Sequence, residues 1–240
     1  MPDLSKTPGR IAGMFDAIAG RYDFLNHLLS AGIDRRWRRL AIASLALTGR
    51  ERVLDLCTGT ADLAIAARTA APPAARVVGI DFAGAMLRVG RAKVEARRLG
   101  DRVTLVRGDA TRIPVADRSV DAVTVAFGIR NVEDTHAACV EMHRVLVPAG
   151  RLAVLEFAVP ETPGIRAVYL WYFNWVLPWI GRLVSRHDAA YQYLPASVTA
   201  FASPDTFARV LERAGFTEVR VRPLTFGIVS LFSARRGEGC

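Results

Sequence analysis

Short apolar runs alternate with amphipathic stretches through the middle of the chain. Runs rich in Val, Ile, Leu and Ala predict buried strands at 52–56, 76–81, 103–106, 120–127 and 151–157. The stretches between them predict helices at 62–69, 85–99 and 135–146. Nearly continuous apolar strands are typical of parallel sheets that carry helices on both faces. The pattern therefore predicts an α/β fold built from strand–helix–strand units.

The two flanks of this alternating region differ from it. Residues 1–48 are amphipathic and predict a helical cover. Residues 159–202 lack the alternation and include an aromatic-rich run, which predicts a helical insertion or lid before the last strands. A helix at 203–214 and strands at 219–224 and 228–234 follow, the last two as an antiparallel pair at the sheet edge. The whole chain, 1–240, is expected to form a single domain with a mostly parallel seven-stranded sheet.

Composition narrows the class of protein. Of the 240 residues 51% are hydrophobic, which excludes a disordered chain. Lys and Arg number 32 against 23 Asp and Glu, and the net charge of +9 fits a nucleic acid, an anionic membrane or an anionic cofactor. The cysteines and histidines lack metal-ligand spacing, so no metal site is predicted. The N-terminus does not resemble a signal peptide, and a cytoplasmic location is expected.

Acidic residues follow three successive predicted strands, where open parallel sheets bind their ligands. The first loop begins with Asp55 and has one glycine, Gly59, unlike the Gly-x-Gly-x-x-Gly loop that holds a pyrophosphate. Asp55 could accept the ammonium group of S-adenosylmethionine, Asp81 the ribose hydroxyls, and Asp109 with Ala110 could hold the adenine edge. Taken singly, the acids could also be a turn residue or a helix cap. Together they favour S-adenosylmethionine and a class I methyltransferase fold, which is Rossmann-like.

Several motifs resemble one named family. They are MFD at 14–16, YDFLN at 22–26, RRW at 35–37, AFGIRNV at 126–132 and the segment 144–157 with RVL, GRL and LEF. With the shorter matches at 177–194 and 214–216, they resemble the ubiquinone/menaquinone biosynthesis C-methyltransferases (the UbiE/MenG family) over residues 10–232. The resemblance implies C-methylation of a polyprenyl quinol, most like demethylmenaquinol. The ubiquinone-pathway 2-methoxy-6-polyprenyl-1,4-benzoquinol, or both quinols, stays an alternative. So does a non-enzymatic scaffold that binds S-adenosylmethionine.

The resemblance also implies which residues meet the cofactor. Thr60 would lie in the loop after the first strand, Asp81 at the ribose, and Asp109 with Ala110 at the adenine. Ala126 ends the fourth strand, where only its backbone could contribute. Asp34 stands where the family usually has histidine.

Catalytic candidates follow the fourth strand. A quinol carbon becomes more nucleophilic as the neighbouring hydroxyl loses its proton, so a residue that stabilises the oxyanion would help the reaction. We expect Arg130 to be that partner, Asn131 to orient the ring, and Tyr22 to be a weaker candidate. A structural ion pair of Arg130 with Glu133 or Glu156 is the alternative.

The aromatic run at 167–180 bears on whether the chain contacts a membrane. Its 14 residues are too few to span a bilayer, which needs about 20. Trp171, Trp175 and Trp179 would share one helical face beside Arg166, Arg182 and Arg186, as a lid on the core or as a contact with the membrane surface. We therefore expect a peripheral enzyme at the inner face of the cytoplasmic membrane, acting on a polyprenyl quinol. No nucleic acid is expected, and a homodimer or a quinone-biosynthesis complex is a further prediction.

Overall fold

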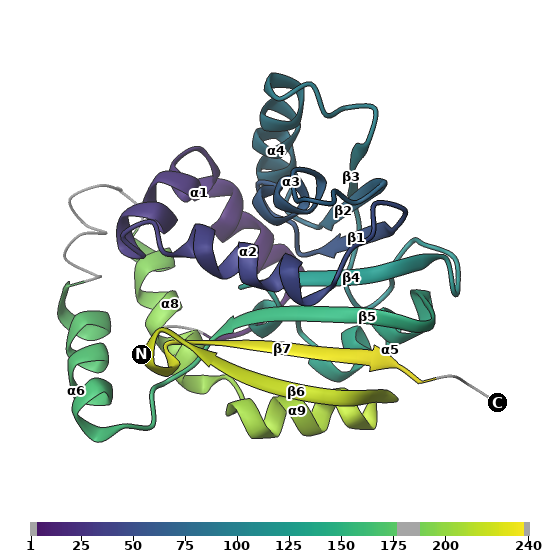
Figure 1. Ribbon diagram of the computed structural model, residues 1–240. Helices are drawn as coiled ribbons and strands as arrows, with labels where there is room; N and C mark the ends of the chain where they lie inside the picture. The colour runs from purple at the N-terminus through teal and green to yellow at the C-terminus, as the bar shows by residue number, and fades with distance from the viewer. Residues whose placement is uncertain (1–3, 177–187, 238–240) are drawn as a thin grey trace.

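The computed structural model describes residues 4–176 and 188–237. In these residues seven strands form one sheet in the order β3-β2-β1-β4-β5-β7-β6 (Figure 1). The strands are β1 Arg52–Leu56, β2 Arg76–Asp81, β3 Val103–Arg107, β4 Val120–Ala126, β5 Leu146–Phe157, β6 Phe216–Leu224 and β7 Val229–Arg236. Strand β7 is antiparallel to both neighbours, whereas β1 to β5 pair in parallel. The expected seven-stranded, mostly parallel sheet is confirmed.

Two apolar cores lie on opposite faces of this sheet because strand side chains alternate. Val53 packs into one core and Leu54 into the other, and Ala122 and Val123 divide in the same way. The first core is covered by α2 Asp34–Ser44, α3 Asp62–Arg68 and α4 Gly84–Ala96. The second is covered by α5 Thr135–Val145 and α9 Pro204–Arg213. Helices on both faces were predicted by the continuous apolar strands, and this is confirmed.

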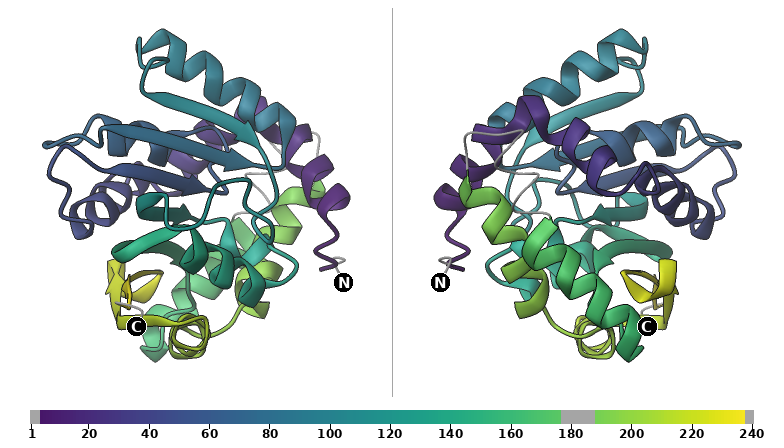
Figure 2. Two further views of the ribbon diagram at one scale, coloured as in Figure 1. Left: turned by 90° about the vertical axis from the view of Figure 1, so that its right-hand side faces the viewer. Right: turned by 90° about the vertical axis from the view of Figure 1, so that its left-hand side faces the viewer.

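The N-terminal segment forms the expected helical cover. Helix α1, Pro8–Leu29, packs against α4 and α8 (Figures 1 and 2). The Asp16 carboxylate accepts a hydrogen bond of 2.7 Å from the backbone N–H of Ala85 in the first turn of α4. An acid at a helix N-terminus satisfies an otherwise unpaired donor, so this contact fixes α1 over that end of α4.

The described part of the insertion is mainly helical, as expected. It contains α6 Pro163–Trp171, a π-helical turn at Tyr172–Val176 and α8 Asp188–Ala200. Figure 1 shows α1, α6 and α8 together beside the end of the sheet where β5 leads into α6. Trp179, Arg182 and Arg186 lie outside the described residues. Within 4–176 and 188–237, none of the helices combines the length and apolarity that a bilayer crossing requires.

Strand β5 begins earlier than the sequence pattern predicts. The helix α5 ends at Val145 and the strand starts at once with Leu146, which pairs with Val120. The register then shifts, so that Ala122 pairs with Arg151, and Ala149 adopts a positive φ of 58°. The residues 148–150 therefore form an irregularity inside the strand instead of a connecting turn.

Candidate functional site

The loop after β1 is held from beneath by Asp55. Its carboxylate is buried and accepts hydrogen bonds from the Thr58 hydroxyl at 2.5 Å and the Thr124 hydroxyl at 2.8 Å. Burial raises the pKa of Asp55 to about 6, although these hydrogen bonds oppose the rise. Both oxygens accept from protein hydroxyls and shape the loop, and a contact of Asp55 with an ammonium group stays a prediction.

A pocket of about 370 Å³ opens above this loop, and we call it the loop pocket. Its walls include Tyr22, Gly59, Asp81, Ala126 and Asn131. The structure therefore brings together five of the predicted site residues, from α1 and from the ends of β1, β2 and β4.

Asp81 is the charged group at the end of β2. Its carboxylate accepts hydrogen bonds of 2.8 Å from the backbone N–H groups of Gly59 and Ala83. Burial raises the pKa of Asp81, and these two hydrogen bonds oppose that rise. Each carboxylate oxygen keeps a further lone pair, so Asp81 can still accept hydroxyl donors from a ligand.

A second hollow of about 350 Å³, the edge pocket, adjoins the loop pocket at Phe82 and Asn131. Asp109 and Ala110 line it, as predicted for the adenine end. The Asp109 carboxylate accepts hydrogen bonds from the backbone N–H and the hydroxyl of Thr111, both at 2.8 Å. The two pockets form an elongated site across the ends of β1, β2 and β3.

A larger pocket of about 750 Å³, the aromatic pocket, lies against the other side of the loop pocket. The two share Phe15, Tyr22 and Phe127. Three rings form one wall of the aromatic pocket. Phe127 lies 4.5 Å from Phe157, and Trp37 lies 6.0 Å and 6.4 Å from these two rings, centroid to centroid. We call Trp37, Phe127 and Phe157 the aromatic triad; edge-to-face and tilted contacts of this kind stabilise a rigid apolar surface.

Arg130 lies beside the Phe157 ring of the triad, in a 3-10 turn at Ile129–Asn131 that follows β4. Its Nη1 donates to Glu156 Oε1 at 2.6 Å, and its guanidinium lies 5.5 Å from the Phe157 ring centroid. The backbone N–H of Arg130 donates to Glu156 Oε2 at 3.2 Å. Arg130 therefore forms the ion pair with Glu156 that was the alternative interpretation, while it also lines the aromatic pocket.

The other two catalytic candidates lie between the pockets. Tyr22 lines both the loop pocket and the aromatic pocket, and burial raises the pKa of its phenol. It is therefore a neutral hydrogen-bond donor at ordinary pH. Asn131 lines the loop and edge pockets, and its Oδ1 accepts a hydrogen bond of 3.1 Å from the buried Tyr193 hydroxyl of α8. Asn131 thus ties the insertion to the cofactor side of the site.

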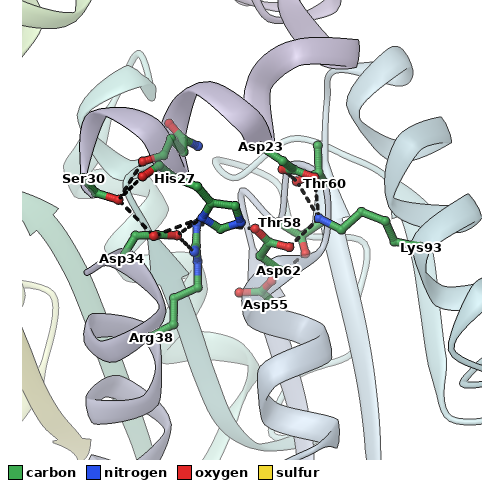
Figure 3. Close-up of polar contacts among 11 residues, drawn as sticks. Asp23, His27, Ser30, Asp34, Arg38, Asp55, Thr58, Thr60, Asp62 and Lys93 are labelled. Carbon is green, nitrogen blue, oxygen red and sulfur yellow. Dashed lines mark hydrogen bonds and ion pairs between the residues drawn. The ribbon is translucent and has the colours of Figure 1, made fainter. Parts of the chain in front are cut away.

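Thr60 does not line these pockets; its side chain fastens the cover to the loop instead (Figure 3). The Thr60 hydroxyl donates to Asp23 Oδ1 at 2.5 Å. The Lys93 ammonium donates to Asp23 Oδ2 at 2.7 Å and forms a second ion pair with Asp62. One lysine of α4 therefore joins α1, the loop and the first turn of α3.

A second polar group, also in Figure 3, surrounds Asp34 at the start of α2. Its carboxylate pairs with Arg38, and Oδ1 accepts from the Ser30 hydroxyl at 2.9 Å and from His27 Nδ1 at 3.0 Å. These contacts lower the pKa of Asp34, although burial opposes them. Ser30, Asp34 and Arg38 all line the aromatic pocket.

Comparison with known proteins shows the family of the chain. The model of the ubiE/COQ5 methyltransferase family matches residues 4–236. The chain belongs to this family. It is 47% identical over 229 residues to "Ubiquinone/menaquinone biosynthesis C-methyltransferase UbiE" of Geobacter sp. strain M21, covering 95% of this chain and 97% of the relative. It is 48% identical over 218 residues to "Demethylmenaquinone methyltransferase" of Thermus thermophilus, covering 91% and 97% of the two chains.

The fold also matches solved structures. A SAM-dependent methyltransferase from Aquifex aeolicus superposes with a TM-score of 0.56 at 20% identity, covering 78% of this chain and 82% of that one. Family and fold together make the chain a methyltransferase that uses S-adenosylmethionine. The site residues fit this cofactor: Asp81 presents a buried carboxylate to the loop pocket, and Gly59 has no neighbouring atom within 4 Å of an added Cβ, which leaves the approach to the loop open.

Sequence patterns overlooked several residues of the site. The aromatic triad joins α2, the residue after β4, and β5, and the lysine network joins three helices, so neither forms a local motif. One local signal was available. Asp34 and Arg38 are four residues apart on a predicted helix, a spacing that favours an ion pair.

Proposed function

We propose that this chain transfers a methyl group from S-adenosylmethionine to a ring carbon of demethylmenaquinol. As a member of the ubiE/COQ5 family it is a C-methyltransferase of ubiquinone/menaquinone biosynthesis. The observation that carries the proposed substrate is the aromatic pocket, which adjoins the loop pocket across Phe15, Tyr22 and Phe127. A flat, apolar ring in that pocket would lie beside the methyl donor in the next one.

The cofactor, when bound, supplies an electrophilic methyl group on a sulfonium sulfur. Asp81 would hold its ribose hydroxyls, and Asp109 with Ala110 would lie at its adenine. The chain's main task is to align a ring carbon with that methyl group and to exclude water. Helix α1 serves both needs, because it walls both pockets and is fastened to the loop through Asp23 and Thr60.

Arg130 would stabilise the quinol oxygen as its proton leaves. Its guanidinium is buried at the pocket wall, where the low dielectric strengthens charge interactions. Glu156 orients the guanidinium and compensates its charge. Tyr22 would donate a hydrogen bond from its neutral phenol, and Asn131 would hold the ring edge near the cofactor side.

Reconstituted methyl transfer tests this proposal. Purified protein, S-adenosylmethionine and a chemically reduced short-chain demethylmenaquinol should give the methylated quinone by mass spectrometry. The Asp81→Ala variant should lose this activity together with cofactor affinity. Selective methylation of 2-methoxy-6-polyprenyl-1,4-benzoquinol would support the ubiquinone alternative. Cofactor binding without transfer to either quinol would support the scaffold.

A membrane contact is the second part of the proposal. Helix α6 and the turn after it expose Val168, Trp171 and Trp175 with exposed fractions of 66%, 60% and 72%. These positions are three and four residues apart, as on one helical face. Large apolar side chains on one exposed face suit insertion into a lipid interface. We infer a peripheral enzyme at the inner face of the cytoplasmic membrane; a homodimer or a quinone-biosynthesis complex stays a prediction.

Vesicle binding tests the membrane contact. Co-sedimentation with phosphatidylglycerol-containing vesicles should fall by more than tenfold for Trp171→Ser with Trp175→Ser. The control is Val140→Ser on α5, another exposed apolar position, with 42% exposure. Unchanged vesicle binding of the double tryptophan variant would overturn the membrane contact and leave the methyltransferase assay unaffected.

A further inference from the structure

Two buried arginine–carboxylate pairs lie at the aromatic pocket, which both arginines and Asp34 line. One is Arg130 with Glu156, and the other is Arg38 with Asp34. All four residues are at most 8% exposed. Buried ion pairs are expensive to desolvate and are weak stabilisers, so two of them at one pocket call for an explanation beyond folding.

The pairs lie beside different rings of the aromatic triad. The Arg130 guanidinium lies over the ring of Phe157. Trp37 follows Asp34 by three residues in α2, so the two are neighbours on the helix surface, and Asp34 pairs with Arg38. One pair therefore adjoins Phe157 and the other adjoins Trp37, and the centroids of these two rings are 6.4 Å apart. An aromatic ring that stacks near the triad and carries oxygen atoms at opposite positions would present one oxygen to each pair.

We propose that Arg38 and Asp34 recognise the second hydroxyl of a 1,4-quinol, para to the hydroxyl at Arg130 and Glu156. This inference rests on the proposed function. A hydroxyl both donates and accepts hydrogen bonds, and an arginine–carboxylate pair offers one partner of each kind. A quinone oxygen can only accept. Asp34, the carboxylate that lines the pocket, can only accept, and it therefore selects the reduced ring, which is the nucleophilic form.

The polar groups around Asp34 have room for such a hydroxyl. The Ser30 hydroxyl lies 2.9 Å from Asp34 Oδ1 and 2.7 Å from the backbone oxygen of Asn26. A hydroxyl donates one hydrogen bond at a time, so Ser30 can turn to Asn26 and leave Asp34 to the substrate. Arg38 has five N–H donors, and its contacts with Asp34 and Asp62 leave others for the quinol oxygen.

A double-mutant-type cycle tests the proposal: it combines substitution of one side chain with removal of one ligand hydroxyl and compares the binding affinities. Four probes are used without oxygen and with S-adenosylhomocysteine present: 2-prenyl-1,4-naphthohydroquinone, its quinone, 2-prenyl-1-naphthol and 3-prenyl-1-naphthol. Each naphthol lacks one of the two hydroxyls. Arg38→Gln should weaken binding of the hydroquinone about 10- to 100-fold. It should weaken one naphthol by no more than about twofold, because that naphthol lacks the hydroxyl at Arg38. Arg130→Gln should show the opposite preference between the naphthols.

Three further measurements fix the interpretation. Arg35→Gln, an exposed arginine of the same helix, is the matched control and should change none of the affinities. Asp34→Asn should reduce the preference of the protein for hydroquinone over quinone. If Arg38→Gln does not fold, Arg38→Lys provides the same cycle, since it keeps the charge and loses the planar fork.

The outcomes separate the two levels of the proposal. If Arg38→Gln weakens the hydroquinone and both naphthols equally, or weakens none of them, the second recognition site is refuted while methyl transfer by the wild type still supports the proposed function. If the wild type neither binds nor methylates the hydroquinone, the proposed function and this inference both fail.

Discussion

The two variants that each remove one partner of the Arg130–Glu156 pair should shift the pH profile of methyl transfer in opposite directions. Arg130→Gln leaves the Glu156 carboxylate uncompensated near the quinol oxygen, and Glu156→Gln leaves the guanidinium uncompensated. A charge within about 4–6 Å changes a neighbouring pKa by roughly 1–3 units. The negative charge should therefore raise the pKa of the bound quinol hydroxyl, and the positive charge should lower it.

The size of each effect follows from the contacts. Glu156 accepts hydrogen bonds from Arg130 Nη1 at 2.6 Å, from the Arg130 backbone at 3.2 Å and from the Phe157 backbone at 2.9 Å. Breaking a buried pair of this kind costs about 3–5 kcal/mol of unfolding free energy in either variant. The rate consequences differ. Arg130→Gln loses the group that stabilises the oxyanion, which should lower kcat about 10²- to 10³-fold.

The assay is anaerobic methyl transfer to a short-chain demethylmenaquinol, followed across pH as kcat and kcat/KM. The acidic limb of the profile should move to higher pH in Arg130→Gln and to lower pH in Glu156→Gln. Unfolding curves and the affinity for S-adenosylmethionine establish that each variant is folded. Two shifts in the same direction, or unshifted profiles with a proportional loss of folded protein, would show that the pair is structural alone.

Three other variants probe the supports of the site. Asp23→Asn should weaken S-adenosylmethionine binding about 5- to 30-fold in calorimetry, because it loosens the cover from the loop at Thr60. Glu51→Gln should lose about 3 kcal/mol of unfolding free energy at pH 7, because hydrogen bonds from backbone and side-chain groups lower the pKa of Glu51 from 4.5 to about 2 although burial opposes them. In denaturant curves this difference between variant and wild type should disappear as pH falls from 4.5 to about 2. Asp55→Asn should show the opposite sign, because burial raises the pKa of Asp55 in the folded protein to about 6. The charge of Asp55 therefore costs stability as pH rises from about 4 to 6, and over that range the variant should gain up to about 3 kcal/mol of unfolding free energy relative to the wild type. A difference that does not change with pH would refute the burial argument.

The positions of strands and helices could be predicted because strands buried on both faces of a parallel sheet consist of nearly continuous apolar residues. The predicted strands at 52–56 and 76–81 match β1 and β2 at both ends. The start of β5 was missed for a physical reason. Pro148, Ala149 and Gly150 are typical of a break, and only the pairing of Leu146 with Val120 keeps them within a strand. That pairing is long-range and leaves no local signal.

The site was predictable where chain order alone fixes position. Asp81 and Asp109 end neighbouring parallel strands, so their meeting at one edge of the sheet follows from topology. Asp55 ends a strand as well, yet its carboxylate turns inward because Thr124 lies opposite it in the β1–β4 register. A sequence shows the acid at the strand end, but it does not show that a hydroxyl on the neighbouring strand donates a hydrogen bond to that acid.

Helix α1 forms part of the wall of both the loop pocket and the aromatic pocket. Tyr22 faces both pockets, Asp23 grips the cofactor loop and Asp16 caps α4. Besides stabilisation of the quinol oxygen, methyl transfer to carbon needs strict alignment of donor and acceptor, and a wall fixed at several points supplies this alignment. The YDFLN motif at 22–26 can be understood in these terms. Its tyrosine lies between the pockets and its aspartate holds the helix to the loop, so we expect this one motif to position the quinol ring against the methyl donor.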